Sequence, residues 1–241
     1  MSEPVEAPDL IVSFPAGGAG GSTLEQLERL ADRKGSGYVA LSNPASAEDL
    51  ASGQWQAQST DTVRRAAVQS AAGRIILVGH CMGGLSALRL ADGLGSATAL
   101  PVGVLAVNTP CPDLAGRIPT MSRFSDGEIA ELLAGEGFPQ DLLDDEDMLA
   151  EIADGLRADA AVADRLAEWV NSVDDLENLH VLSTRGDTFI PPEQCAAWRH
   201  RVSGEFQLTI APGGHAIDEA SIGLLERAID SIKACVQPDP V

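Results

Sequence analysis

The sequence predicts an α/β fold in which a mainly parallel sheet is flanked by helices. Short β-branched or leucine-rich runs alternate with stretches of helical apolar spacing along most of the chain. The composition agrees, since 44% of the 241 residues are hydrophobic and 24 are glycines, whereas only 4% are aromatic. A chain of this length is expected to form one domain, over residues 1–241, whose core needs no disulfides.

Six segments are expected to form the strands of this sheet. Each is a short apolar or β-branched run bounded by polar or turn-forming residues. In chain order they are residues 10–14, 38–42, 75–78, 102–108, 180–184 and 206–210.

The helices are expected between these runs, where apolar residues recur with helical spacing. Two adjacent prolines, Pro191 and Pro192, open one of them, and a proline costs little at a helix start because the first N–H groups have no helical partner there. In chain order the helices are residues 23–34, 60–72, 82–94, 192–202 and 217–235.

Residues 123–173 interrupt the alternation, because they show helical spacing but no strand-like run. We interpret them as a helical insertion. Active sites of parallel sheets form beyond the carboxyl ends of the strands, so an insertion that leaves from such an end can cover the site as a lid. We expect its apolar faces to line a pocket and its carboxylates to face water.

The charge balance excludes several kinds of partner. Acidic residues outnumber basic ones 36 to 16, which gives a formal charge of −20. Such a field repels nucleic acid and anionic membrane surfaces. Much of the excess lies in residues 125–168, and a run of this kind is usually a solvated helix face.

The sequence shows no sign of secretion, membrane insertion or a metal site. It opens without a basic stretch followed by an apolar run, and it contains no apolar segment of about 18 residues. The four cysteines are scattered without a CxxC pair, so neither a zinc site nor a disulfide framework is indicated. We therefore expect a cytoplasmic protein without a metal or cofactor.

The strongest local signal is the segment 79–83, Gly-His-Cys-Met-Gly, between a buried run and an amphipathic stretch. It matches the nucleophile elbow G-x-S-x-G of the α/β-hydrolase fold, with Cys81 in the serine position. The nucleophile sits on a strained turn where neighbouring Cβ atoms would clash, and Gly79 and Gly83 leave that space free. The alternative is a glycine-rich turn that holds a buried thiol.

A nucleophile needs a base and a group that orients the base, which in this fold follow in the order acid, then histidine. Asp187 comes just after one predicted strand, and His215 comes just after the last, behind two glycines. Cys81, His215 and Asp187 are therefore the candidate catalytic residues. Two alternatives stay open: Asp218 lies close to His215 along the chain, and Asp187 could belong to an ordinary turn.

Acyl transfer also needs backbone N–H groups that stabilise the developing oxyanion. In this fold one comes from the residue after the nucleophile, here Met82, and the other from the loop after the first strand, here Ala16 or Gly17. That glycine-rich loop lacks the lysine of a P-loop and the spacing of a dinucleotide-binding motif, which argues against a nucleotide site.

Over nearly its whole length the chain resembles a type II thioesterase, the stand-alone editing hydrolase of polyketide and nonribosomal-peptide assembly lines. The resemblance lies in the FP-AGG loop, the elbow GHCMGG, the acidic helical segment, GDTFIPPEQCAAWRH and the terminal PGGH. It implies that Cys81 replaces the usual serine, with Asp187 as acid and His215 as base. It also implies a carrier-protein partner whose phosphopantetheine arm carries the acyl group, and a lid that shapes the acyl pocket.

Three functions remain open from the sequence. The leading one is an enzyme that takes an acyl group onto Cys81 and passes it to an acceptor, which could be a small molecule. A second is an editing thioesterase that hydrolyses acyl thioesters. A third, from another class, is a catalytically degenerate hydrolase fold that serves as a binding subunit.

Overall fold

The predicted parallel sheet is present. The computed structural model describes residues 7–17, 22–112, 121–135, 138–173, 176–216 and 221–236. In these ranges one sheet of six parallel strands has the order β2-β1-β3-β4-β5-β6. All six predicted strands are confirmed, with ends that differ by one or two residues: β1 (Asp9–Phe14), β2 (Gly37–Ala40), β3 (Arg74–His80), β4 (Val102–Val107), β5 (Leu179–Thr184) and β6 (Phe206–Ala211).

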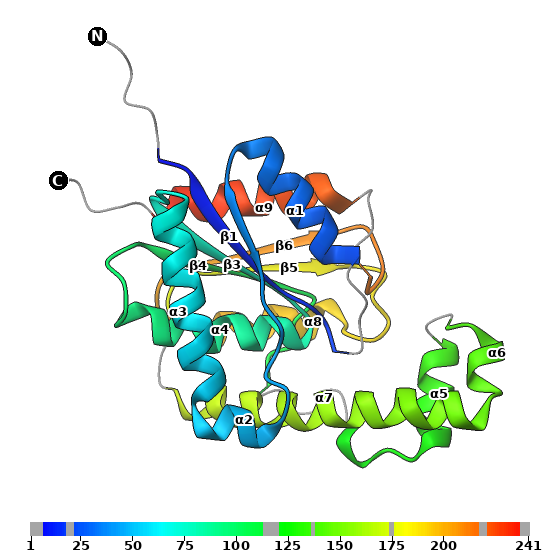
Figure 1. Ribbon diagram of the computed structural model, residues 1–241. Coiled ribbons are helices and arrows are strands. Elements are labelled where there is room, and N and C mark those ends of the chain that lie inside the picture. Colours follow the sequence, from blue (N-terminus) through cyan, green and yellow to red (C-terminus); the bar gives the residue numbers. More distant parts are fainter. Residues whose placement is uncertain are drawn as a thin grey trace, which may run out of the picture.

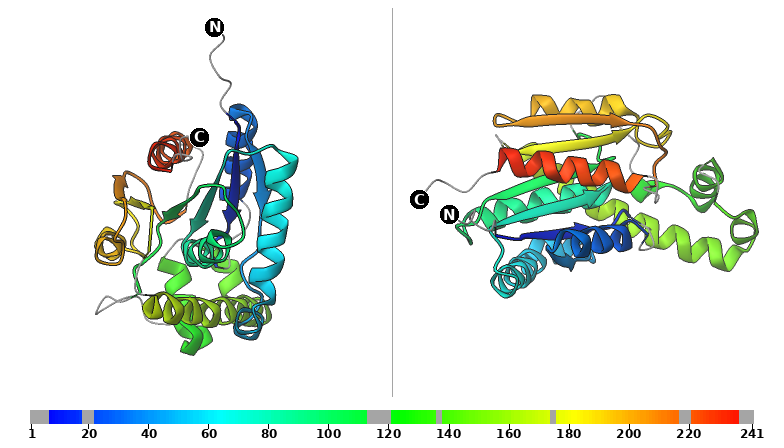
Figure 2. Two further views of the ribbon diagram at one scale, coloured as in Figure 1. Left: turned by 90° about the vertical axis from the view of Figure 1, so that its left-hand side faces the viewer. Right: turned by 90° about the horizontal axis from the view of Figure 1, so that it is seen from above.

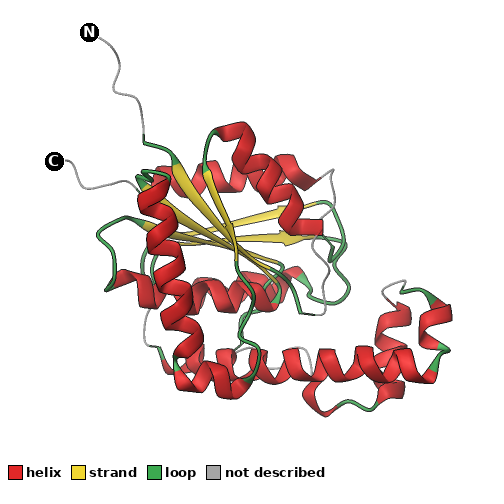
Figure 3. Cartoon of the chain, viewed as in Figure 1, coloured by secondary structure: helices red, strands yellow, loops and turns green. Residues whose placement is uncertain are grey.

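Helices cover both faces of the sheet, which makes three layers (Figures 1 and 3). One face carries α1 (Ser22–Lys34) and α9 (Ile222–Cys235), and the other carries α3 (Gln54–Gln69), α4 (Met82–Gly95) and α8 (Pro192–Ala196) (Figure 2). Alternate residues of a strand point to opposite faces. Ile11 accordingly packs in the core layer of α1 and α9, whereas its neighbours Leu10 and Val12 pack in the other layer.

Two helical predictions need correction at their boundaries. A helix was expected from residue 60, but α3 already begins at Gln54, directly after an unpredicted helix, α2 (Ala47–Ser52). The side chain of Ser46 caps α2 by accepting a hydrogen bond from the Asp49 N–H, and Gly53 separates the two helices in the left-handed conformation. The helix expected over 192–202 is a short α8 followed by a 3₁₀ turn, Ala197–His200.

A helical segment lies between β4 and β5, where the insertion was predicted. It contains a 3₁₀ turn (Met121–Arg123), α5 (Asp126–Gly135), α6 (Gln140–Leu143) and α7 (Glu146–Ser172). The long α7 packs against α4 and α2, and α5 and α6 lie near its start, beyond the carboxyl ends of the strands (Figure 1). No helix in the described ranges is long and apolar enough to cross a membrane.

The strand order locates the crevice of the fold. The chain moves from β1 outward to β2 and then returns across β1 to β3, so the order reverses between β1 and β3. In open α/β sheets, ligands bind beyond the carboxyl ends of the strands at such a reversal. The loop after β1 and the turn after β3, with Gly17 and Cys81, meet at this place.

Candidate active site

Cys81 occupies a strained turn between β3 and α4. Its backbone has φ 54° and ψ −119°, which a residue with a side chain rarely adopts. The surroundings fix this turn: the Cys81 N–H donates to the Val107 carbonyl at 2.8 Å, and the Thr109 hydroxyl donates to the Cys81 carbonyl at 3.0 Å. A Cβ at Gly79 would collide with the backbone of Gly83, so the turn requires glycine there, as predicted.

His215 and Asp187 form a hydrogen-bonded pair beside this turn. The distance between His215 Nδ1 and Asp187 Oδ2 is 2.8 Å, and the Asp187 side chain is fully buried. The other oxygen, Oδ1, accepts hydrogen bonds from the Phe189 and Ile190 N–H groups at 2.9 and 2.7 Å. The carboxylate is therefore held in one orientation and fixes the histidine ring. The alternative acid, Asp218, lies outside the described residues.

The pKa of His215 is raised above its ordinary value. Burial alone would lower this pKa, but the hydrogen bonds with Asp187 and Cys81, and their negative charges, raise it from 6.5 to about 10. The interaction with Cys81 requires that the thiol and the imidazole face each other. A thiol that faces an imidazole can pass its proton to the ring when its sulfur attacks a substrate.

Two cysteines outside the elbow have raised pKa values. Burial raises the pKa of Cys195 to about 12. A hydrogen bond with the Glu205 carboxylate, together with burial, raises that of Cys235 to about 11. Both groups therefore remain thiols at neutral pH, and a thiol is a far weaker nucleophile than a thiolate.

Three side chains that the sequence did not predict hold the loop after β6 that carries His215, here called the histidine loop. The His215 carbonyl accepts hydrogen bonds from His80 Nε2 at 2.9 Å and from Asn108 Nδ2 at 3.1 Å. The Thr184 hydroxyl lies 2.6 Å from the Gly214 carbonyl, to which it can donate. Asn108 Nδ2 also lies 3.0 Å from that hydroxyl, and Asn108 Oδ1 accepts from the Thr184 N–H at 2.9 Å.

His80 takes part in this network in its neutral form. Burial and, to a smaller extent, the nearby His215 lower its pKa to about 4, so the ring carries a single proton at neutral pH. A carbonyl oxygen can only accept, so that proton lies on Nε2. His80 therefore donates to the histidine loop without adding charge next to the ring of His215, 4.9 Å away between ring centroids.

The predicted oxyanion donors lie at the turn or against it. Met82 and Gly17 line the same cavity as Cys81, whereas Ala16 is buried and does not. The loop after β1 lies directly on the start of α4, because a Cβ at Gly83 would be 2.5 Å from the Pro15 carbonyl oxygen. Of the two predicted positions in this loop, Gly17 is thus the better placed to contact a bound molecule.

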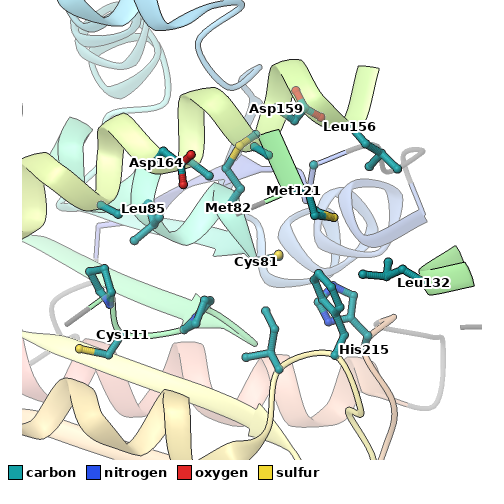
Figure 4. A pocket seen from close by; sticks show the side chains of 18 of the residues that line it. Cys81, Met82, Leu85, Cys111, Met121, Leu132, Leu156, Asp159, Asp164 and His215 are labelled. Atoms are coloured by element: carbon teal, nitrogen blue, oxygen red, sulfur yellow. The ribbon is translucent and has the colours of Figure 1, made fainter. Parts of the chain in front are cut away.

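A cavity of about 340 Å³ opens over the cysteine and the histidine (Figure 4). Its walls come from the turn after β3, the loop after β4, the helical segment and the loops after β5 and β6. Most of the lining is apolar, with these residues among it: Met82, Leu85, Pro110, Met121, Leu132, Leu156, Ala160, Ala163, Phe189 and Ile190. A cavity of this size and character suits a small acyl group.

One expectation about this cavity is wrong for two residues, whereas the other described carboxylates of the segment are exposed as expected. The carboxylates of the helical segment were expected to face water, but Asp159 and Asp164 of α7 line the cavity together with its alanines. In the described part of the chain, no cluster of three or more histidine, cysteine, aspartate or glutamate residues could hold a metal ion.

The network around the histidine loop gives a first testable prediction. Asn108→Ala should slow alkylation of Cys81 by iodoacetamide at neutral pH roughly tenfold, because the base is no longer held beside the sulfur. His180→Gln is the control, since His180 is also buried and its ring bonds Thr209 on the neighbouring strand. An equal loss of reactivity in both variants would mean that Asn108 acts only on stability.

Comparisons with known proteins agree with this architecture. The alpha/beta hydrolase family matches residues 11–224. Similar solved structures include the RedJ thioesterase of the prodiginine pathway in Streptomyces coelicolor, with 22% identity, a TM-score of 0.66 and coverage of 96% of this chain and 90% of that one. No curated protein sequence matched the chain.

Two further structures show the same likeness. YbtT, a type II thioesterase of the yersiniabactin NRPS/PKS pathway, has 20% identity and a TM-score of 0.68 over 96% of this chain and 93% of its own. Human thioesterase 2 has 19% identity and a TM-score of 0.65, with coverage of 94% of this chain and 96% of its own. At these identities the likeness establishes the fold alone.

Proposed function

The chain belongs to the alpha/beta hydrolase family, and within it we propose that this protein is a thioesterase-like acyltransferase with a Cys81–His215–Asp187 triad. It takes an acyl group from the phosphopantetheine thioester of an acyl or peptidyl carrier protein and passes it to an acceptor. The observation that carries the proposal is the arrangement of Cys81 on a strained elbow, facing a histidine that a buried aspartate holds at 2.8 Å. Structural neighbours named as type II thioesterases support it.

In the first step the Cys81 thiol gives its proton to His215, and the sulfur attacks the thioester carbonyl carbon. The negative charge moves to the carbonyl oxygen, which the Met82 N–H and an N–H of Ala16 or Gly17 stabilise. The bond to the pantetheine sulfur then breaks, and the leaving thiolate takes the proton from His215. The products are free pantetheine thiol and a thioester on Cys81, so one thioester replaces another.

In the second step an acceptor attacks the Cys81 thioester. His215, now neutral, removes the proton of the amine, thiol, hydroxyl or water. The carbonyl bond to Cys81 breaks, and the Cys81 thiolate leaves beside the protonated His215. Asp187 stays ionised and orients the ring throughout.

We assign the helical segment between β4 and β5 to a lid over this site. Residues of α5 and α7, such as Leu132 and Leu156, line the same cavity as Cys81 and His215 (Figure 4). Enclosure by this segment keeps water from the acyl group and shapes the space that the acyl chain fills.

The test of the proposal is intact-mass analysis after incubation with acyl-pantetheine thioesters. The wild type should gain one acyl group, and Cys81→Ala should gain none. Cys235→Ser is the matched control, because Cys235 is also partly exposed but lies outside the cavity, and it should acylate like the wild type. Absence of an adduct on Cys81 with every thioester would favour the degenerate binding subunit.

A further inference from the structure

The cavity over Cys81 extends to both sides of the nucleophile. Figure 4 shows Leu85 and Cys111 on one side of Cys81. Leu132 and Leu156 lie on the other side, and they line the cavity as well. A thioester substrate has two unlike parts on either side of its carbonyl group, an acyl chain and a pantetheine arm that contains amide groups. The two sides of the cavity can therefore hold these two parts separately.

The two sides differ in burial. Leu85 is 5% exposed and Cys111 is fully buried, and both belong to the main hydrophobic core, so we call the part of the cavity that they line the buried arm. Leu132 and Leu156 are partly exposed, and they line what we call the exposed arm. An apolar chain gains most where it leaves water, whereas amide groups keep hydrogen bonds to water near the surface. The buried arm thus suits the acyl chain and the exposed arm suits the pantetheine.

Helix α7 runs along the cavity and indicates the length of the buried arm. Asp159 marks the level of the reaction on this helix, because a Cβ at Gly17, in the loop expected to bind the acyl oxygen, would be 3.3 Å from the Asp159 Cβ. Figure 4 places Asp164 on the side of Leu85, so Ala167, almost one turn further along α7, lies deeper on that side. From Asp159 to Ala167 the helix rises roughly 12 Å, at about 1.5 Å per residue. An extended hexanoyl chain fits within this length.

Small side chains of α7 leave the space of the buried arm open. Ala160, Ala163 and Ala167 recur with helical spacing on the face of α7 that lines the cavity. The helix packs against α4, which contributes Leu85 to the same lining. Ala163 lies midway between the other two alanines and packs against the main core. A larger side chain at this position would therefore fill space in the middle of the buried arm.

We propose that the buried arm binds the acyl chain and that Ala163 determines how long a linear chain the site accepts. The exposed arm then holds the pantetheine next to the thioester sulfur. The inference rests on the proposed function and specifies its substrate class, which is unbranched apolar acyl groups up to about the length of hexanoyl. Each methylene group that the buried arm removes from water should raise kcat/KM about fourfold.

The test compares acetyl-, butyryl- and hexanoyl-pantetheine in single-turnover acylation of Cys81, followed by intact mass. For the wild type we expect kcat/KM to rise with chain length. The readout is the ratio of kcat/KM for hexanoyl to that for acetyl, because a loss of folded enzyme lowers both rates alike. Ala163→Leu should lower this ratio at least roughly tenfold, since the added side chain fills the buried arm. Ala163→Val is a smaller change that should lower the ratio less, and it tests the inference if the leucine variant does not fold.

Ala158→Leu is the matched control, because it adds the same side chain to the same helix at an exposed position outside the cavity lining. It should keep the ratio of the wild type. Leu132→Phe enlarges a side chain of the exposed arm and should slow acylation by all three thioesters by a similar factor.

Three results would overturn the inference while the proposed function stands. They are a ratio near one in the wild type, a wild-type ratio in the Ala163 variants, and a fall of the ratio in Leu132→Phe alone, which would assign the acyl chain to the exposed arm. Absence of acylation with all three thioesters would overturn both the inference and the proposed function.

Discussion

Replacement of His215 by alanine is expected to slow acylation of Cys81 by about 10³-fold, which is within the usual range for the loss of a general base. An ordinary cysteine thiol is only a few per cent thiolate at pH 7. In the proposed mechanism His215 takes the proton of Cys81 during the attack and supplies the proton for the leaving thiol. Both contributions vanish in the variant. Single-turnover acylation with an acyl-pantetheine thioester measures the loss.

Two further variants make this result specific. Asp187→Asn should be milder, because the ring remains and only its orientation and charge stabilisation are weakened. His200→Ala should behave like the wild type, since His200 is exposed and lies outside the cavity lining. Acylation of the His215 variant at the wild-type rate would refute the triad.

The variant His215→Ala also gives a prediction about how the stability of the protein depends on pH. A raised pKa means that the folded protein holds the His215 proton more tightly than the unfolded chain does. The stabilisation is therefore fully present below the ordinary pKa of 6.5 and is lost as the pH rises towards about 10. The difference in Tm between the wild type and His215→Ala should decrease over this range, and a difference that grows with pH would contradict the assigned shift.

The parts of the site that the sequence predicted are those tied to local patterns. The need for glycine on both sides of Cys81 could be predicted because a strained turn leaves no space for a Cβ at those positions. In the structure, a Cβ at Gly79 or Gly83 would collide with neighbouring backbone atoms. Asp187 and His215 could be assigned because each follows a recognisable strand, and parallel strands bring their carboxyl ends to one edge.

The parts that the sequence did not predict depend on contacts between distant segments. Asn108 and Thr184 meet across β4 and β5, and nothing near either residue indicates that both hold the His215 loop. The position of two α7 carboxylates at the cavity was also missed. The face that lines the cavity is rich in small alanines, so the aspartates at its borders, Asp159 and Asp164, reach the cavity as well. Apolar periodicity alone could not reveal this.

Cys81→Ser is expected to change the fate of the acyl group as well as its rate of transfer. A serine would turn the thioester into an oxygen ester, a downhill step, whereas Cys81 exchanges one thioester for another at little cost in free energy. The acyl group on Cys81 therefore stays activated. Thioesters favour amine and thiol attack over attack by water more strongly than oxygen esters do, so the cysteine suits transfer or ring closure.

The measurement is a partition experiment with a carrier-bound acyl thioester, with and without amine or thiol acceptors. We expect the ratio of transfer to hydrolysis to fall roughly tenfold in Cys81→Ser. This corresponds to a change of about 1.4 kcal/mol in the difference between the activation free energies of transfer and hydrolysis. Cysteine proteases release acyl groups to water efficiently, so the nucleophile by itself does not decide the outcome. If the wild type only hydrolyses its substrate with every acceptor, and the serine variant hydrolyses it equally fast, the cysteine has no special role and the protein is an editing thioesterase.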